Sequence, residues 1–253
     1  MGEINMAREG RLTADKFGFD TPVDAPLYAK PPIHYRDVHA ISILYETDME
    51  AALDLLPEGL VIEPPALASV LFIKYPFSTL GPYDETILGI SCLFEGTPRF
   101  YIPHIVLNSE MPLAAGREIW GFPKKLADIT IETDAPSDLL SGKMERPSGH
   151  LICSAGIRPE TPVDVSGEPE DSYSLALRLI PSPVEVAKPS LAELVETHSV
   201  NTLKEVWTGP GWVEFHSHSE VDPWHKLKVK EVVNASYRIN DMILGFGRVV
   251  RTY

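Results

Sequence analysis

The apolar residues of this chain fall in short runs in which β-branched and aromatic side chains alternate with small or polar ones. Turn-forming residues separate these runs, and the chain contains 23 prolines and 17 glycines. Such runs are typical of β-strands. We therefore predict strands in VHAISILY, ALASVLFIKYPF, ETILGISCLF, FYIPHIVLN, LADITIET, HLICSAGI, SYSLALRLI and GWVEFHSH.

Two segments carry helical signals instead. TDMEAALDLLPEG is rich in Ala and Leu; Thr47 and Glu50 have the spacing of a capping box, and Pro57 with Gly59 ends the helix. NASYRINDMILGFGRVV is predicted to form a last helix or a helix–strand unit. The sequence shows neither a regular alternation of strands and helices nor an internal repeat. Many short strands with few short helices predict a mainly β fold, a closed antiparallel β-barrel.

The pattern also divides the chain. Residues 1–32 are polar and interrupted by prolines, so we predict an N-terminal arm that lies across the rest of the molecule. Residues 33–253 are predicted to form one β-barrel domain, a length that all-β barrels often reach without splitting. The acidic stretch IRPETPVDVSGEPEDS is expected to be an exposed loop.

Composition and charge exclude several classes of protein. The net charge of −14 argues against a nucleic-acid surface and against a basic membrane-binding patch. Cys92 and Cys153 both lie in apolar runs, which favours buried free thiols of a reducing compartment over a disulfide. The first residues lack the apolar core of a secretory signal, and no apolar run approaches membrane-spanning length. We expect a soluble, cytoplasmic protein.

Familiar cofactor and metal motifs are absent from the sequence, including GxGxxG, GxxxxGK[ST], HExxH and GxSxG. The best candidate for a metal site is HSHSEVDPWH, where His216 and His218 share a strand face with Glu214 and His225 follows. Three alternating polar residues are equally typical of a plain solvent-exposed face. We predict no metal site and no organic cofactor.

The segment GREIWGFPKKLA places two lysines, Lys124 and Lys125, behind Trp120, Phe122 and a proline. A solvated surface doublet is the ordinary interpretation of two adjacent lysines. Burial among apolar groups, however, disfavours a charged amine and lowers its pKa from the usual value of about 10.4. A shift to about 7 corresponds to roughly 4 to 5 kcal/mol. A neutral lysine can attack a ketone and form a Schiff base, which gives adjacent lysines in an apolar setting a chemical purpose.

GREIWGFPKKLA closely resembles the active-site segment of the acetoacetate decarboxylase superfamily. HYRDVHAISILYETDMEAALDLLPEGLVIE, LGPYDETILG, EVWTGPGWVEFHSH and VKEVV resemble family segments in the same order, so the resemblance covers roughly residues 30–253. Acetoacetate decarboxylase is itself the usual example of a lysine activated in this way, so the chemical argument and the resemblance are not independent of each other.

The resemblance implies roles for individual residues. Lys124 falls at the Schiff-base lysine, and Lys125 at the neighbour that helps set its position and pKa. Glu85, in GPYDETI, falls at the pocket carboxylate, and Arg36, in HYRDV, at an arginine facing the substrate. Because they differ from the smaller residues of the best-known decarboxylases, Trp120 and Phe122 are expected to shape the substrate pocket. The family fold is a closed antiparallel barrel with an apolar cavity, assembled into homo-oligomers of four or more subunits.

The same resemblance implies a function and leaves alternatives open. It predicts a decarboxylase that forms a Schiff base with a small β-keto acid, converting acetoacetate to acetone and CO2 without metal or organic cofactor. The alternative is a pyruvate aldolase–dehydratase or hydratase that uses the same imine. A ligand-binding barrel without turnover is the third possibility.

The strand pattern around the lysines disagrees with this assignment. A regular strand through KKLADITIE places Lys125 on the apolar face with Ala127 and Ile129, and Lys124 on the opposite face. A turn or bulge after Pro123 removes the conflict. We follow the resemblance and predict that Lys124 faces the pocket and that desolvation affects it more than repulsion from Lys125.

Overall fold

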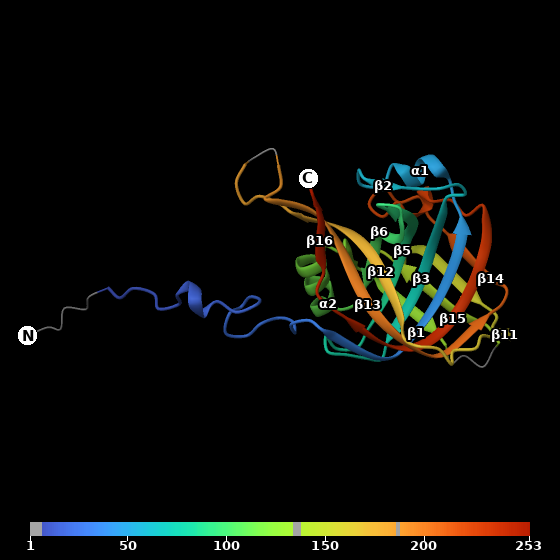
Figure 1. Ribbon diagram of the computed structural model, residues 1–253, viewed down its shortest axis with the longest axis horizontal. Coiled ribbons are helices and arrows are strands. Elements are labelled where there is room, and N and C mark those ends of the chain that lie inside the picture. Colours follow the sequence, from blue (N-terminus) through green and yellow to red (C-terminus); the bar gives the residue numbers. More distant parts are fainter. Residues whose placement is uncertain (1–6, 134–137, 186–187) are drawn as a thin grey trace, which may run out of the picture.

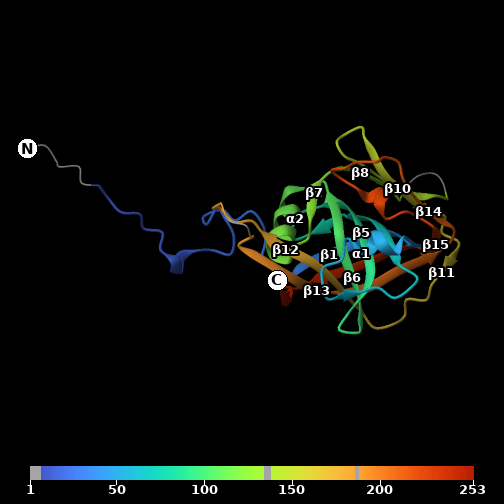
Figure 2. The ribbon, with the colours of Figure 1, turned by 90° about the horizontal axis from the view of Figure 1, so that it is seen from above.

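The computed structural model describes residues 7–133, 138–185 and 188–253. Its main body is a closed β-barrel, which confirms the predicted fold class (Figures 1 and 2). Seven strands form the ring in the order β5–β3–β1–β15–β13–β12–β6, and β6 closes the ring by pairing with β5. They are β1 (Ile33–Glu46), β3 (Leu67–Tyr75), β5 (Tyr83–Phe94), β6 (Thr97–Leu107), β12 (Glu170–Ile180), β13 (Leu191–Thr208) and β15 (Glu231–Leu244).

Most neighbours in the ring are antiparallel, but β6 forms a parallel seam. It pairs with β12 at Phe100 and Tyr101, and with the short strand β7 (Lys124–Leu126) from Ile105 to Leu107. β5 occupies the other edge of β6. The two parallel partners therefore follow one another along a single edge, and Pro103, which has no N–H to donate, falls between them.

A second sheet covers the outside of the barrel. It has the order β14–β10–β9–β8 and consists of β8 (Asp128–Glu132), β9 (Leu140–Glu145), β10 (Leu151–Ile157) and β14 (Gly211–Phe215). Ile43 and Phe72 of the barrel share a fully buried apolar core with Met144 and Ile152 of this sheet. The sequence pattern predicts the individual strands but not this second layer.

Short elements complete the chain. They are the helices α1 (Met49–Leu53) and α2 (Glu110–Ala115), the π-helical turn η2 (Gly116–Trp120), the single turns η1 (Ala14–Lys16) and η3 (Trp224–Lys226), and the strands β2 (Leu60–Val61), β4 (Phe77–Ser78), β11 (Thr161–Pro162) and β16 (Arg248–Thr252).

Two predictions about helices need correction. α1 forms where expected, but its N-cap is Asp48, whose carboxylate accepts the Ala51 N–H at 3.0 Å; Thr47 is buried instead of capping. The segment predicted as a last helix or a helix–strand unit forms parts of two strands, β15 and β16, which each pair with β13.

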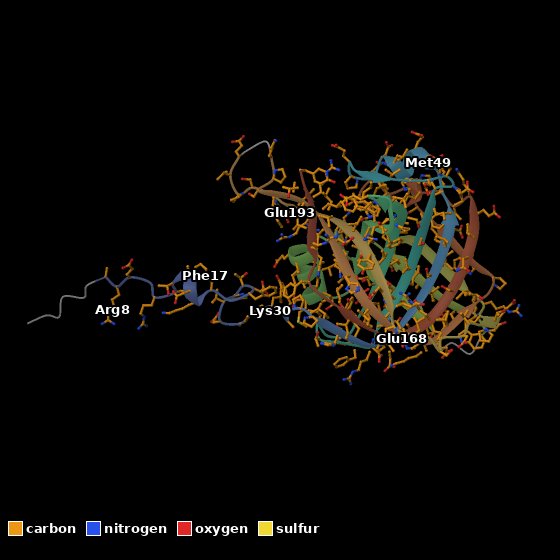
Figure 3. All side chains as sticks on the ribbon, viewed as in Figure 1. Arg8, Phe17, Lys30, Met49, Glu168 and Glu193 are labelled. Atoms are coloured by element: carbon orange, nitrogen blue, oxygen red, sulfur yellow. The ribbon has the colours of Figure 1, made fainter. Side chains whose placement is uncertain are left out.

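The N-terminal arm extends away from the barrel before its last residues reach it. Figure 3 shows Arg8, Phe17 and Lys30 along this path. Tyr28 anchors the arm, because it is buried and its hydroxyl donates to the Glu118 carboxylate on η2. Phe19 lies edge-on to Tyr28, with ring centroids 6.2 Å apart.

Two further expectations concern the cysteines and membrane-spanning segments. Cys92 and Cys153 are buried and unpaired, as predicted. Within the described ranges, no helix is both long and apolar enough to cross a membrane.

Candidate active site

The inside of the barrel holds a cavity of about 310 Å³. Strand alternation creates its lining, because every second residue of a strand faces the same side. Leu71, Ile73 and Tyr75 of β3 face inward, whereas Phe72 between them packs against the outer sheet. Most of the lining is apolar. Its charged members are Glu85, Lys124 and Arg238.

Lys124 enters this cavity from β7. Its side chain is 6% exposed, and its amine lies 2.7 Å from a carboxylate oxygen of Glu85. The amine also lies 5.6 Å from the ring centroid of Tyr83 and 5.7 Å from that of Phe122. An amine and a carboxylate thus form an ion pair inside an apolar enclosure, where Coulomb attraction is little screened.

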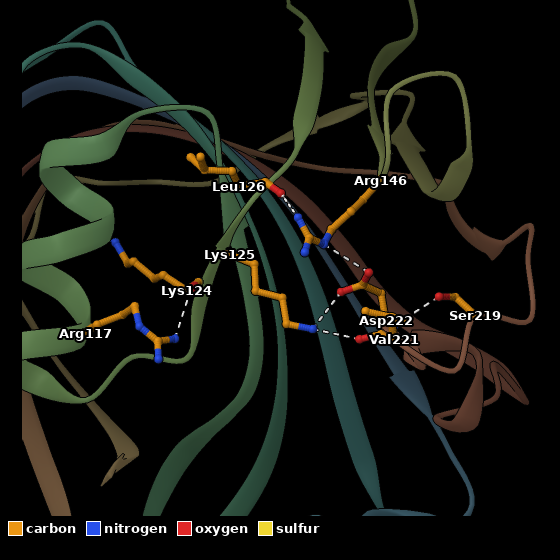
Figure 4. Close-up of polar contacts among 8 residues, drawn as sticks. All are labelled: Arg117, Lys124, Lys125, Leu126, Arg146, Ser219, Val221 and Asp222. Atoms are coloured by element: carbon orange, nitrogen blue, oxygen red, sulfur yellow. Dashed lines mark hydrogen bonds and ion pairs between the residues drawn. The ribbon is translucent and has the colours of Figure 1, made fainter. Parts of the chain in front are cut away.

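Lys124 and Lys125 leave the chain in opposite directions, as Figure 4 shows. The Lys125 amine donates to the backbone oxygen of Val221 at 2.7 Å and to the Asp222 carboxylate at 2.9 Å. Arg146 donates to the second oxygen of the same carboxylate at 3.0 Å. Lys125 is therefore held outside the cavity, where its amine faces the Asp222 carboxylate and not Lys124.

A break in the strand resolves the conflict between the alternation pattern and the resemblance. β7 ends at Leu126, the Ala127 N–H donates to the Leu107 oxygen, and β8 begins at Asp128 in the other sheet. Ala127 and Ile129 pack in the core between the sheets rather than in the cavity. The pattern was misleading because it treated two strands as one.

Glu85 projects from β5 and is 3% exposed. Its second carboxylate oxygen accepts a hydrogen bond from the Tyr75 hydroxyl at 3.2 Å. The Tyr75 ring lies 4.9 Å from that of Tyr35 and 4.4 Å from that of Tyr83. Burial raises the pKa of Tyr75 and Tyr83 well above 10, so both phenols stay protonated. The Tyr75 hydroxyl therefore keeps its proton and can donate it to the Glu85 carboxylate, which holds Glu85 in place.

Arg36 does not join this site. β1 carries a register shift between Tyr35 and Val38, with Asp37 at a φ of 52°. Tyr35 and Val38 line the cavity, whereas Arg36 is exposed and stacks over the Phe77 ring at 5.4 Å. A bulge of this kind is not visible in the sequence, so the expectation that Arg36 faces the substrate is corrected.

A family model described as acetoacetate decarboxylase matches residues 20–253. The chain belongs to this family. It is 33% identical over 237 residues to decarboxylase DEC1 of Cochliobolus heterostrophus, covering 92% of this chain and 94% of that protein. It is 34% identical over 259 residues to acetoacetate decarboxylase 1 of Bradyrhizobium diazoefficiens, covering 100% and 99%.

Solved structures agree with this assignment. Acetoacetate decarboxylase from Legionella pneumophila superposes with a TM-score of 0.84 at 28% identity, covering 99% of each chain. The enduracididine biosynthesis enzyme MppR, complexed with pyruvate, superposes with a TM-score of 0.77 at 20% identity, covering 94% of this chain and 99% of that one. The second likeness shows a shared fold alone.

Within this acetoacetate decarboxylase family member, the two predicted aromatic residues have different positions. Phe122 lines the cavity. Trp120 is fully buried behind it, with ring centroids 6.0 Å apart, and its indole N–H donates to the Gly245 oxygen at 3.0 Å. Trp120 thus supports the wall that Phe122 forms.

Gly116 is a site residue that the sequence analysis missed. A Cβ atom here would lie 2.5 Å from Cδ and 2.7 Å from Cε of Lys124. The absence of a side chain at the start of η2 makes room for the lysine stem. The neighbouring Arg117 donates to the Lys124 backbone oxygen at 3.1 Å, which fixes β7 from the other side (Figure 4).

The histidine cluster considered as a metal site is dispersed. His216 contacts the Ser154 hydroxyl at 2.6 Å, while His218 and His225 lie with ring centroids 4.4 Å apart. The described part of the chain contains no group of three or more His, Cys, Asp or Glu side chains arranged to hold a metal ion.

Proposed function

We propose that this protein decarboxylates small β-keto acids through a Schiff base on Lys124, with acetoacetate as the reference substrate. The observation that carries the proposal is the ion pair between the Lys124 amine and Glu85 inside a mostly apolar cavity. The full-length similarity to proteins named acetoacetate decarboxylase supports the same reaction.

The ion pair can run the proton transfers of the reaction. Glu85 accepts a proton from the Lys124 ammonium, the neutral amine attacks the ketone, and Glu85 returns this proton to the departing water. The resulting iminium withdraws the electrons of the bond to the carboxylate, CO2 leaves, and an enamine remains. Glu85 then relays one proton from solvent to the enamine carbon. Water hydrolyses the new iminium, which releases acetone and restores the Lys124 ammonium.

The cavity favours the step in which charge is lost. Apolar walls solvate the departing carboxylate poorly, whereas the neutral CO2 and enamine lose little there. Phe122 contributes one such wall. Tyr75 holds Glu85 beside the reacting atoms, and Lys125 positions β7 through its contacts with Asp222.

Pyruvate aldol chemistry is the second candidate, and the half-buried Arg238 in the cavity lining favours it because an aldolase must hold the pyruvate carboxylate throughout its cycle. Borohydride trapping separates the candidates. Acetoacetate should give acetone, CO2 and a reduced adduct on the peptide containing Lys124. Condensation of pyruvate with aldehydes, without acetone from acetoacetate, overturns the proposal. Trapping without any turnover indicates the ligand-binding barrel.

We infer further that the protein is a cytoplasmic homo-oligomer. Leu12, Phe17 and Phe19 of the arm are 58%, 61% and 42% exposed, which is unfavourable unless another subunit covers them. The buried free thiols fit a reducing compartment. Sedimentation of the full chain should show an assembly that weakens when residues 1–19 are removed; a full-length monomer contradicts this inference.

A further inference from the structure

Arg238 stands across the cavity from Glu85. On β15 it pairs with Ala40 of β1, Ala40 pairs with Ile73 of β3, and Ile73 pairs with Glu85 of β5. Arg238 and Glu85 therefore occupy one row of inward-facing residues, three strand steps apart in a ring of seven. At that separation they project from nearly opposite walls of the barrel.

Among the described residues, the guanidinium of Arg238 has no hydrogen-bond or ion-pair partner. Its Nε is buried without a hydrogen bond, and Glu170 attracts it electrostatically without forming an ion pair. The other two charges of the cavity, Lys124 and Glu85, satisfy each other. Because a guanidinium stays protonated in proteins and a buried unpaired charge is costly, this cation is suited to an anion supplied by a ligand.

The wall around Arg238 is polar, unlike the wall around Lys124. Asn240 lies two residues away, and its Oδ1 is buried without a hydrogen bond. Strand β13 lies next to β15, and β12 lies next to β13. These two strands add hydroxyl groups to the same side of the cavity, those of Ser172, Ser174, Thr197 and Ser199. The cavity thus has an apolar end that carries the amine and a polar end that carries the unpaired cation.

The volume of the cavity admits a substrate longer than acetoacetate. Pockets that hold organic ligands measure roughly 300 to 1,000 Å³. The cavity of about 310 Å³ lies within that range and admits a keto acid extended by a methylene and a carboxylate.

We propose that the preferred substrate is a β-keto diacid whose second carboxylate, on the far side of the ketone, binds Arg238. The proposal rests on the Schiff-base decarboxylase function above. An arginine paired with the departing carboxylate would stabilise the charged ground state and slow CO2 loss. A cation opposite Glu85 instead holds a carboxylate that survives the reaction.

Besides the substrate, the proposed reaction consumes only a proton, and the water released in imine formation is taken up again in hydrolysis. The bond between the α-carbon and the nearer carboxylate breaks, and its electrons pass into the iminium as CO2 leaves. Protonation and hydrolysis then release a γ-keto acid that still carries the second carboxylate. A six-carbon β-keto diacid gives levulinate, so levulinate is a stable probe of the same contacts.

Trapping with matched ketones tests the proposal. Levulinate and methyl isoamyl ketone have the same shape, but one ends in a carboxylate and the other in an isopropyl group. With borohydride, we expect half-maximal labelling of Lys124 at a concentration at least tenfold lower for levulinate. Arg238→Met should abolish that preference while still trapping methyl isoamyl ketone. Arg238→Lys should retain part of it, because a cation remains.

Turnover supplies the second measurement. After subtraction of the spontaneous rate, kcat/KM for β-ketohexanedioate should exceed that for β-ketohexanoate by at least tenfold, and Arg238→Met should remove the difference. Arg158→Met makes the same charge change at an exposed surface arginine and should leave both substrates unaffected. If Arg238→Met does not fold, the same two rates are measured for Arg238→Lys. A smaller preference for β-ketohexanedioate then supports the role of Arg238, and an unchanged preference contradicts it.

The possible failures are distinct. Equal trapping of the two ketones by the unmodified protein, or an undiminished preference in Arg238→Met, overturns the second-carboxylate proposal and leaves the decarboxylase standing. Absence of any adduct on Lys124, with no CO2 from acetoacetate or either longer substrate, overturns the proposed function itself.

Discussion

At the scale of single residues, Lys124 and Lys125 share a peptide bond but occupy different dielectric surroundings. One amine faces Glu85 in the cavity, and the other reaches Asp222 near solvent with its side chain 37% exposed. Both amines lie beside a carboxylate. Of the two, only the Lys124 amine also borders space that can hold a substrate. We therefore assign the nucleophile to Lys124 as a proposal to be tested.

The first prediction separates the two lysines. Lys124→Ala should abolish both borohydride labelling and turnover, because Lys124 carries the only amine among the described residues that line the cavity. Lys125→Met is the matched control. It should keep much of the activity at pH 7 to 8, because Arg146 still neutralises Asp222. Peptide mass spectrometry after trapping reports both results, and a label on Lys125 contradicts the assignment.

The second prediction concerns Glu85. Glu85→Gln should lower acetoacetate turnover at least about tenfold, a barrier increase of about 1.4 kcal/mol, because the amide cannot deliver a proton to the enamine carbon. Imine formation should survive and remain trappable. Asp84→Asn changes the neighbouring carboxylate, which contacts Asn108 on the other side of β5, and should have little effect. Equal losses in the two variants speak against a proton-transfer role for Glu85.

At the scale of elements, the site depends on the turn that precedes β7. Gly121 follows η2 directly and has a φ of 77°, which suits glycine, and the Phe122 N–H bonds back to the Gly116 oxygen at 3.0 Å. This closed turn delivers Lys124 to the edge of β6 next to Ile105. The turn and the pairing with β6 together position a strand of only three residues.

The third prediction uses the tight packing of that turn. Gly116→Ala should reduce kcat more than tenfold while the melting temperature changes little, because the new methyl group displaces only the flexible lysine stem. Gly167→Ala is the control, since nothing lies within 4 Å of a Cβ there. Steady-state kinetics and thermal unfolding measure the two effects. Undiminished kcat in Gly116→Ala shows that Lys124 does not need its present position.

The sequence predicts strands best where one face is apolar and the other polar. It fails in β15, where the inward residues begin with Arg238 and Asn240 and continue with Met242 and Leu244. A barrel that encloses a partly polar cavity reverses the usual pattern, so this strand resembled a helix. Arg238 was missed for the same reason. The bulge that turns Arg36 outward depends on pairing with distant strands, which a local pattern does not contain.

At the scale of the whole molecule, the barrel is stabilised by cores on both faces of its wall. His104 of β6 packs against Trp224, a residue of the core between the barrel and the second sheet, with ring centroids 6.0 Å apart. Burial, followed by the charge of Lys125, lowers the pKa of His104 from 6.5 to about 4. The folded protein therefore favours the neutral imidazole.

The fourth prediction follows from that pKa. Between about pH 6.5 and pH 4 the unfolded chain binds the proton more readily, so stability is full above 6.5 and falls as the pH drops towards 4. The loss attributable to His104 is on the order of 3 kcal/mol. His104→Leu should flatten the pH dependence of the unfolding free energy across this window. Denaturant titrations at several pH values measure it, and parallel curves for the two proteins contradict the assignment.

The double contact of Asp222 has an evolutionary consequence. The two lysines form one motif in the sequence, yet the structure gives each of them a different set of contacts. As the proposed nucleophile, Lys124 can be exchanged only together with the chemistry. Lys125 belongs to a structural unit with Asp222 and Arg146, 97 and 21 positions away in the chain, and can change whenever that unit changes with it. Among descendants of this chain, Lys125 and Asp222 should therefore vary together while Lys124 stays constant.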